Sequence, residues 1–471
     1  MPSTPNSTLF GRSQYDLTPT QKLLYASERA PNYRQIAKLF ATRSKYTLSP
    51  CDLVPSDVQL QLAEFGEFAE MAYGDAEFIY GNIEMLTQTD FPLEGYNALR
   101  QAKLVAAFQG TVADVPGCVS YRAETKQLVI GFSGTATVRQ LLFDLYATKV
   151  AHPAGQGSAV HSGFWKMYLG CKTQIFTAIH KAVRKYDVAE VVSVGHSMGA
   201  ALSYLLALDL ICSEALLSSG LTLTVAAFGS PRVGNARLYD RWQEMVESYR
   251  SFHGDNSVKE YLVKANNDGV HTIPTESLGY RHLARIPLYL YHGRLFYIPN
   301  SEREHGDFTV STEALDQTRP PDHPRGGHQY YNCRSFEKVV LRMFWLNKMM
   351  KAHPEGWQQA YLAQIALLAQ SELCTASDVS EDGELPGSPV GDGVQMNDER
   401  SELTEQTANR SSHGIDGEVV IPGTIAVTPG SEGRGMGVFS KWQMRKWFQD
   451  TPPLSPVSAR RDAYGHIPDT V

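Results

Sequence analysis

The fold is decided by one stretch of sequence, Val191-Val192-Ser193-Val194-Gly195-His196-Ser197-Met198-Gly199-Ala200-Ala201-Leu202. Its apolar, β-branched beginning predicts a buried strand, and the Ala- and Leu-rich residues at its end predict a helix. Gly195 and Gly199 stand two positions before and two positions after Ser197. A sharp turn from strand to helix leaves little room for side chains at these positions, and glycine has none. The stretch therefore predicts a nucleophile elbow that exposes the hydroxyl of Ser197.

Other apolar runs place this corner in a larger sheet. Residues 221–228 and 261–265 are short apolar runs separated by helical segments, which is the pattern of a largely parallel sheet. Residues 118–121 and 128–132 predict two strands joined by a polar turn. The sequence therefore predicts an α/β fold whose largely parallel central sheet is flanked by helices.

Helical spacing marks three further segments. A helix starting at Ser56 opens the folded region, and residues 335–370 predict two more helices. Residues 200–217 are rich enough in Ala and Leu to suggest a membrane span, but Asp209 and Glu214 interrupt them. We therefore expect residues 200–217 to form a buried helix.

The composition divides the chain into three parts. Residues 1–55 form an N-terminal extension of uncertain order, and residues 56–372 form the folded domain. Residues 373–471 are acidic, rich in Pro and Gly, and of low complexity, which predicts a disordered tail. Within the tail, residues 438–448 combine basic and aromatic side chains. This island is compatible with a membrane surface, with a protein partner, or with a chance cluster.

The overall charge and the cysteines exclude several classes of function. The net charge of −7 argues against nucleic-acid binding, which requires a cationic face. Six cysteines lie scattered without a CxxC pair, which predicts free thiols and no metal site. Residues 1–20 are polar and contain no apolar run of the kind that a secretory signal needs. We therefore expect an intracellular, cytoplasmic protein, with peripheral contact to membranes or lipid droplets left open.

Four blocks of sequence resemble the fungal class 3 lipases, a family with the α/β-hydrolase fold. The elbow block is similar to the nucleophile block of that family. The other three are Phe132-Ser133-Gly134-Thr135, similar to its oxyanion segment, Val160-His161-Ser162-Gly163-Phe164, and Ala227-Phe228-Gly229-Ser230-Pro231-Arg232-Val233-Gly234-Asn235. Together they span roughly residues 60–335 in the order of the family. The resemblance implies a serine hydrolase with the α/β-hydrolase fold.

The chain departs from the family pattern at two positions. Ser133 stands where the family usually has arginine, and Leu141 stands where it has a tryptophan in its lid. Residues 136–150 still place apolar side chains at helical spacing, which is typical of a mobile lid or of a fixed surface helix. Neither departure removes a group that the reaction of the family requires.

A serine nucleophile requires a histidine base and a buried carboxylate that stabilises the histidine cation. In this fold they follow the serine in the order Ser, Asp, His, each at the carboxyl end of a strand. Asp268 follows the apolar run 261–265 and lies in a segment similar to the acid block of the family, and Asp255 is the rival acid. His328, followed by aromatic residues, resembles the family's catalytic histidine, and His323 is the rival base.

The oxyanion hole needs two or more preorganised donors. The N–H of Met198, the residue after the nucleophile, is the first candidate. The resemblance implies Thr135 as the second, through its N–H and its hydroxyl. Three histidines, His161, His196 and His282, also fall in blocks similar to the family, and we expect them to be structural.

The resemblance implies a lipase that hydrolyses acylglycerols at a lipid interface, through a Ser-His-Asp triad and an acyl-enzyme, without a metal or organic cofactor. Two other interpretations stay open. One is an esterase for phospholipids or aromatic (feruloyl-type) esters, because the specificity loops cannot be read from the sequence. The other is a non-catalytic scaffold on a hydrolase fold.

Overall fold

The computed structural model describes residues 17–26, 28, 32–134, 148–213, 220–315, 322–331 and 334–378. The tail expected at residues 373–471 lies outside this range from residue 379 onward. Residues 136–147 of the expected lid also lie outside it.

The centre of the molecule is an eight-stranded sheet in the order β13-β12-β10-β8-β7-β4-β3-β2, as the described residues form it. Its strands are β2 (Ala102–Gln109), β3 (Pro116–Arg122), β4 (Gln127–Phe132), β7 (Glu190–His196), β8 (Thr222–Phe228), β10 (Val258–Ala265), β12 (Leu288–Tyr291) and β13 (Arg294–Tyr297). The five strands from β4 to β12 pair in parallel, and β2, β3 and β13 are antiparallel to their neighbours. The predicted largely parallel sheet and the predicted β3–β4 hairpin are confirmed.

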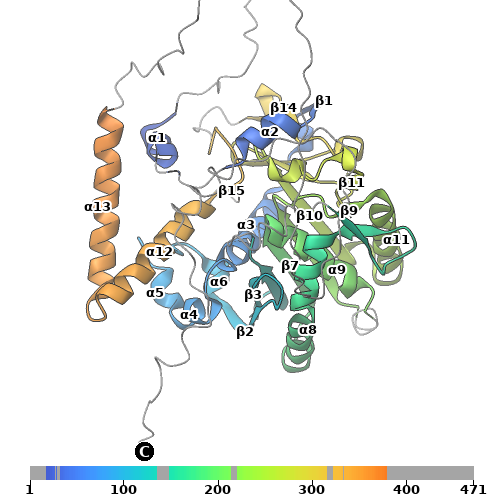
Figure 1. The fold of residues 1–471 in the computed structure, drawn as a ribbon, viewed down its shortest axis with the longest axis horizontal. Coiled ribbons are helices and arrows are strands. Elements are labelled where there is room, and N and C mark those ends of the chain that lie inside the picture. Colours follow the sequence, from blue (N-terminus) through green and yellow to red (C-terminus); the bar gives the residue numbers. More distant parts are fainter. Residues whose placement is uncertain are drawn as a thin grey trace, which may run out of the picture.

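Helices cover both faces of this sheet (Figure 1). One face packs against α8 (Ser162–Lys185), α9 (Met198–Ile211) and α11 (Ala236–His253), and the other packs against α3 (Ser56–Met71). Neighbouring residues of β7 show the alternation, because Val191 belongs to the first core and Val192 to the second. Every residue of β7 is buried, as expected for a parallel strand covered on both faces. Helix α9 is the buried helix that the sequence predicts.

Shorter elements surround the central layers. A second sheet has the order β11-β9-β6-β5, β1 pairs in parallel with β14, and β15 pairs with β16. The bounds are β1 (Arg43–Leu48), β5 (Lys149–Ala151), β6 (Ala159–His161), β9 (Gly234–Asn235), β11 (Tyr280–Arg281), β14 (Asp307–Val310), β15 (Tyr330–Tyr331), β16 (Arg334–Ser335), α1 (Pro19–Ala26), α2 (Arg34–Phe40), α4 (Ala76–Gly81), α5 (Ile83–Leu86), α6 (Asn97–Arg100), α12 (Phe336–Ala352) and α13 (Trp357–Asp378). Six 3₁₀ turns complete the described chain: η1 (Pro50–Asp52), η2 (Asp255–Ser257), η3 (Val270–Thr272), η4 (Glu276–Leu278), η5 (Asn300–Glu302) and η6 (Thr312–Ala314).

The two predicted C-terminal helices are present as α12 and α13, and α13 stands at the edge of the molecule (Figure 1). The N-terminal segment is also partly folded, because α2 and β1 lie on the β14 side of the domain (Figure 1). None of the helices within the described ranges is long and apolar enough to cross a membrane.

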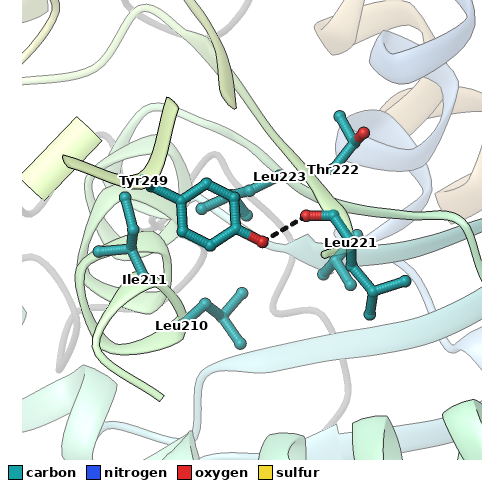
Figure 2. A pocket seen from close by; sticks show the side chains of 7 residues that line it. Leu210, Ile211, Leu221, Thr222, Leu223 and Tyr249 are labelled. Carbon is teal, nitrogen blue, oxygen red and sulfur yellow. Dashed lines mark hydrogen bonds between the residues drawn. The ribbon is translucent and has the colours of Figure 1, made fainter. Parts of the chain in front are cut away.

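A small cavity lies between α9, β8 and α11. Its lining is apolar except for the hydroxyls of Thr222 and Tyr249, and the Tyr249 hydroxyl donates to the carbonyl of Leu221 at 2.6 Å (Figure 2). The cavity volume is about 10 Å³. A space of this size holds no more than a water molecule, so it is a packing defect of the core.

Candidate active site

The corner between β7 and α9 brings two glycines into backbone contact. A Cβ atom on Gly195 would lie 2.3 Å from the carbonyl carbon of Gly199, and one on Gly199 would lie 2.4 Å from the carbonyl oxygen of Phe132. Real Cβ atoms do not approach other atoms so closely, so both positions require glycine. The predicted elbow glycines are thus placed as the sequence suggests.

Ser197 occupies the corner itself. Its φ of 60° and ψ of −128° are strained for a residue with a side chain. Its N–H donates to the carbonyl of Phe228 at 2.9 Å, which ties the corner to the end of the neighbouring strand β8. The side chain is half-buried. The serine therefore stands at the carboxyl edge of the sheet, where ligands bind in folds of this kind.

Met198 begins α9, and its side chain is buried. The first N–H groups of a helix have no acceptor within the helix, and the helix dipole favours negative charge there. The amide of Met198 is therefore suited to hold an oxyanion. Thr135, the second expected donor, lies outside the described residues.

Asp268 and His328 form a buried pair. The Nδ1 atom of His328 lies 3.0 Å from Oδ2 of Asp268, and the two side chains are 2% and 0% exposed. Asp268 also accepts from the hydroxyl of Tyr331 at 2.5 Å and from the N–H of Val270 at 2.7 Å. Burial acts to raise the pKa of Asp268, but the neighbouring side chains of His328 and His271 outweigh it and lower that pKa. Asp268 is therefore ionised in the folded protein.

The hydrogen bonds of His328 set the state of its ring. A carboxylate only accepts hydrogen bonds, so Nδ1 of His328 carries the proton that it shares with Asp268. In the neutral ring, Nε2 then has a free lone pair. This nitrogen is buried and makes no hydrogen bond within the structure described. It is therefore available to accept a proton.

The serine corner and the acid–base pair meet at Gly229, the residue after β8. A Cβ atom on Gly229 would lie 2.9 Å from Oδ2 of Asp268 and 3.1 Å from Cε1 of His328. The preceding residue, Phe228, accepts the hydrogen bond from the N–H of Ser197. Serine, acid and base, which are distant in the sequence, thus lie around the ends of β7 and β8.

His196 contacts His328 directly. The two rings stack with centroids 4.4 Å apart, and Nε2 of His196 donates to the carbonyl of His328 at 2.8 Å. Nδ1 of His196 lies 2.8 Å from the hydroxyl of Tyr73, which donates to it when the ring is neutral. Burial lowers the pKa of His196 well below its ordinary value, with a smaller contribution from the charge of His328. His196 is therefore neutral, and it supports the loop that carries His328.

The rival residues lie elsewhere. Asp255 is exposed in η2, before β10, whereas Asp268 follows the other end of that strand. The ring of His323 stacks on Tyr330 at 4.4 Å. His161 caps α8 by accepting from the N–H of Phe164. The structure thus brings Asp268 and His328 together, and it does not bring Asp255 to them.

An open pocket of about 440 Å³ lies between α1 and α12, beside Asp322 and His323 of the loop that carries His328. Its wall includes Arg334, Lys338 and Arg342, but none of the three predicted catalytic residues. Arg334 and Arg342 already face the carboxylates of Glu67 and Glu94, each at 3.7 Å. These two arginines of the wall therefore each have a carboxyl partner within the chain.

Four residues around the triad escape sequence reasoning: Asn32, Tyr73, His271 and Tyr331. Tyr331 is one of the aromatic residues that follow His328, and this position was the only signal for it in the sequence. His271 lies 3.8 Å from Asp268. The others come from segments far from the triad in sequence, so no local pattern points to them.

Two curated relatives are similar to part of this chain. A lipase of Rhizomucor miehei is 30% identical over 139 residues, which is 30% of this chain and 38% of the relative. A secreted mono- and diacylglycerol lipase of Malassezia globosa is 31% identical over 163 residues, which is 34% of this chain and 48% of the relative. The chain thus spans less than half of the length of these relatives.

Among solved structures, a complex of the Rhizomucor miehei lipase with its propeptide aligns with a TM-score of 0.46 and 19% identity. The alignment covers 66% of this chain and 89% of the Rhizomucor miehei chain. The assignment of the α/β-hydrolase fold rests on the strand order and the elbow described above.

The comparison corrects one expectation. We predicted an intracellular, cytoplasmic protein, but the relatives from Malassezia globosa and Penicillium cyclopium are described as secreted. The prediction rested on the polar residues 1–20. A targeting segment is recognised and removed separately from the folded domain, so these residues do not indicate the compartment in which the domain works.

The family model of class 3 lipases matches residues 129–277. This range holds most of β4, the elbow with Ser197, and Asp268, whereas His328 lies beyond it. The matched segment therefore includes the strand-to-helix corner on which the fold assignment rests. Residues 129–277 of this chain are thus similar to the class 3 lipases.

Proposed function

We propose that this chain is a serine carboxylic-ester hydrolase that acts on acylglycerols. The observation that supports it most is the buried pair of His328 and Asp268, with the free Nε2 atom of His328 near the elbow of Ser197. Such a pair activates a serine hydroxyl. A buried imidazole nitrogen without a hydrogen bond costs free energy, and the hydroxyl proton of Ser197 would supply the missing partner.

The reaction has two steps. In the first, Nε2 of His328 takes the proton of the Ser197 hydroxyl, and the oxygen attacks the ester carbonyl. The N–H of Met198 and, by resemblance to the family, the N–H and hydroxyl of Thr135 hold the oxyanion. Asp268 stabilises the imidazolium, which then protonates the leaving alcohol. In the second step, water gives its proton to His328 and attacks the acyl-enzyme, which releases the carboxylic acid and restores Ser197.

The substrate class comes from the relatives. Several of them are named as mono- and diacylglycerol lipases, and the class 3 lipase model matches the segment that holds the elbow. We therefore propose a mono-, di- or triacylglycerol as the ester, presented at a lipid interface. Phospholipids and aromatic esters are the alternative substrates within the same reaction type.

Labelling with a fluorophosphonate probe tests the reaction, because the probe phosphonylates only an activated serine. The wild type is expected to be labelled and Ser197→Ala to be unlabelled. Ser251→Ala is the matched control, since Ser251 is an exposed serine of α11 and its loss should not change labelling. A folded wild-type protein that resists the probe would instead support the non-catalytic scaffold.

A panel of emulsified glycerol esters, a phospholipid and a feruloyl ester tests the substrate class. We expect the highest kcat/KM with a glycerol ester. A clear preference for the phospholipid or the feruloyl ester would overturn the proposed substrate and leave the serine mechanism intact.

A further inference from the structure

The N-terminal segment lies directly on the loops that carry the catalytic acid and base. We call residues 32–37 the N-terminal clamp and residues 322–331 the histidine loop. The clamp lies outside residues 129–277, which match the family model. Its contacts with the histidine loop join residues almost 300 positions apart in the chain.

Asn32 binds two consecutive amides of the histidine loop. Its carbonyl accepts from the N–H of His328 at 3.0 Å, and its Oδ1 accepts from the N–H of Gln329 at 2.8 Å. Asn32 is 5% exposed, so these bonds are shielded from water. The backbone on both sides of the catalytic imidazole is thereby held by one residue.

Arg34 binds the same loop at a second point. Its Nε and Nη2 atoms both donate to the carbonyl of Gly326, at 2.9 and 2.8 Å. The guanidinium also pairs with Glu28 at 3.1 Å. Gly326 and Gly327 have φ values of 58° and 118°. The loop is therefore irregular here, and side-chain contacts replace the hydrogen bonds of regular structure.

The clamp also covers the acid. A Cβ atom on Gly269, the residue after Asp268, would lie 2.4 Å from the carbonyl oxygen of Tyr33 and 2.5 Å from Cβ of Ile36. The ring of Tyr33 meets the ring of His328 edge-on, with centroids 5.3 Å apart. The clamp thus contacts the backbone beside the acid and the ring of the base at once.

We propose that the N-terminal clamp positions the catalytic base, with Asn32 and Arg34 as positioning residues that hold His328 against Asp268. The inference rests on the proposed function, because it assigns the clamp a role in that reaction. A general base works only at hydrogen-bond distance from its proton donor, and a displacement of about 1 Å can cost 100-fold in rate. In the absence of the clamp, the carbonyl of Gly326 and the amides of His328 and Gln329 lose the partners described above.

Variants at the two positions test the proposal on the full chain. Asn32→Ala removes the acceptor of the Gln329 N–H, and Arg34→Ala removes both donors to Gly326. We expect kcat on a soluble ester to fall about 10- to 100-fold while KM changes less than about twofold, because the base is displaced and the substrate site is not. Asn32→Asp keeps an acceptor oxygen and should recover most of the kcat that Asn32→Ala loses.

Arg43→Ala is the matched control. Arg43 lies in β1, in the same N-terminal segment but away from the histidine loop, and the variant removes its exposed ion pair with Asp307 of β14. It should leave kcat unchanged. The proposal is overturned if kcat of Asn32→Ala and Arg34→Ala stays within twofold of the wild type, or if Arg43→Ala loses as much activity at an equal change of Tm.

Hydrogen exchange gives a measurement that does not depend on activity. In the wild type, the amides of His328 and Gln329 should exchange slowly, and Asn32→Ala should accelerate both while the amides of β7 stay protected. Equal exchange in the two proteins would contradict the clamp. A wild type that neither hydrolyses esters nor reacts with the probe would refute the proposed function and the catalytic role of the clamp together, whereas an active wild type with unaffected variants would refute the clamp alone.

Discussion

His328 packs between aromatic rings and beside one carboxylate. His196 stacks on it at 4.4 Å, Tyr33 meets it edge-on at 5.3 Å, and Asp268 binds its Nδ1 atom at 3.0 Å. These contacts restrict rotation of the imidazole in the absence of substrate. Preorganisation of this kind lowers the barrier because the base does not have to be ordered during the reaction.

Asp268→Asn should lower kcat by about 10³- to 10⁴-fold with little change in KM. The neutral amide cannot stabilise the imidazolium and can donate to Nδ1, which favours the wrong tautomer of His328. Steady-state kinetics on a soluble ester measure this effect. Asp255→Asn is the control and should retain full activity, since Asp255 is exposed before β10. A larger loss in Asp255→Asn than in Asp268→Asn would show that the acid is misassigned.

At the scale of elements, the first turn of α9 lies against the end of β4. The position of a Cβ atom on Gly199 is 2.4 Å from the carbonyl oxygen of Phe132 and 2.6 Å from that of Ser133. Both atoms belong to the backbone, so they cannot move aside as a flexible side chain would. The close approach of helix and strand is what places Ser197 at the corner, where it is half-buried.

Gly199→Ala should therefore destabilise the protein by about 2 kcal/mol or more and abolish most of the activity, because α9 must move away from β4. Urea unfolding and probe labelling measure the two effects. Gly81→Ala is the control, since it also places alanine in a helix but has no atom within 4 Å of the new Cβ. Alanine at position 81 should be neutral or stabilising. Equal stability of the two variants would contradict the close approach.

At the scale of the whole molecule, two buried carboxyl groups on α3 join distant parts of the chain. Glu67 accepts from the N–H of Leu99 at 2.9 Å and faces Arg334, which follows the histidine loop, at 3.7 Å. Glu70 accepts from the hydroxyl of Tyr96. Burial raises the pKa of Glu67 to about 7 and that of Glu70 to about 8.

These pKa values predict a loss of stability at alkaline pH. A raised pKa means that the folded protein binds the proton more tightly than the unfolded chain does. The stabilisation is complete below the ordinary Glu pKa of 4.5 and is lost as the pH rises through 7 to 8. The Tm of the wild type should therefore fall between pH 5 and 9, and Glu70→Gln, which cannot ionise, should reduce that fall.

Thermal unfolding at several pH values measures this slope. Glu77→Gln, which changes an exposed carboxylate of α4, is the control and should keep the slope of the wild type. A slope in Glu70→Gln that equals the wild-type slope would mean that Glu70 is already ionised in the folded protein.

The elements and part of the site could be predicted because their signals are local. The strand before Gly195 and the helix after Gly199 follow from the periodicity of neighbouring residues, and Asp268 was found at the end of a predicted strand. His328 is favoured over His323 by resemblance to the family. The disorder of the tail and the role of Thr135 stay predictions, since residues 379–471 and 135–147 lie outside the described range.

The sequence by itself determined the class of fold and the strand-to-helix corner at Ser197, since each depends on residues adjacent in the chain. The roles of Asp268 and His328 as acid and base stay predictions. Only the tertiary structure decided which side chains surround and hold Ser197, Asp268 and His328. Asn32, Tyr73 and Tyr331 reach the triad from the N-terminal segment, from the end of α3 and from β15. Such contacts arise when separate segments pack on the same edge of the sheet, and no spacing within one segment records that packing.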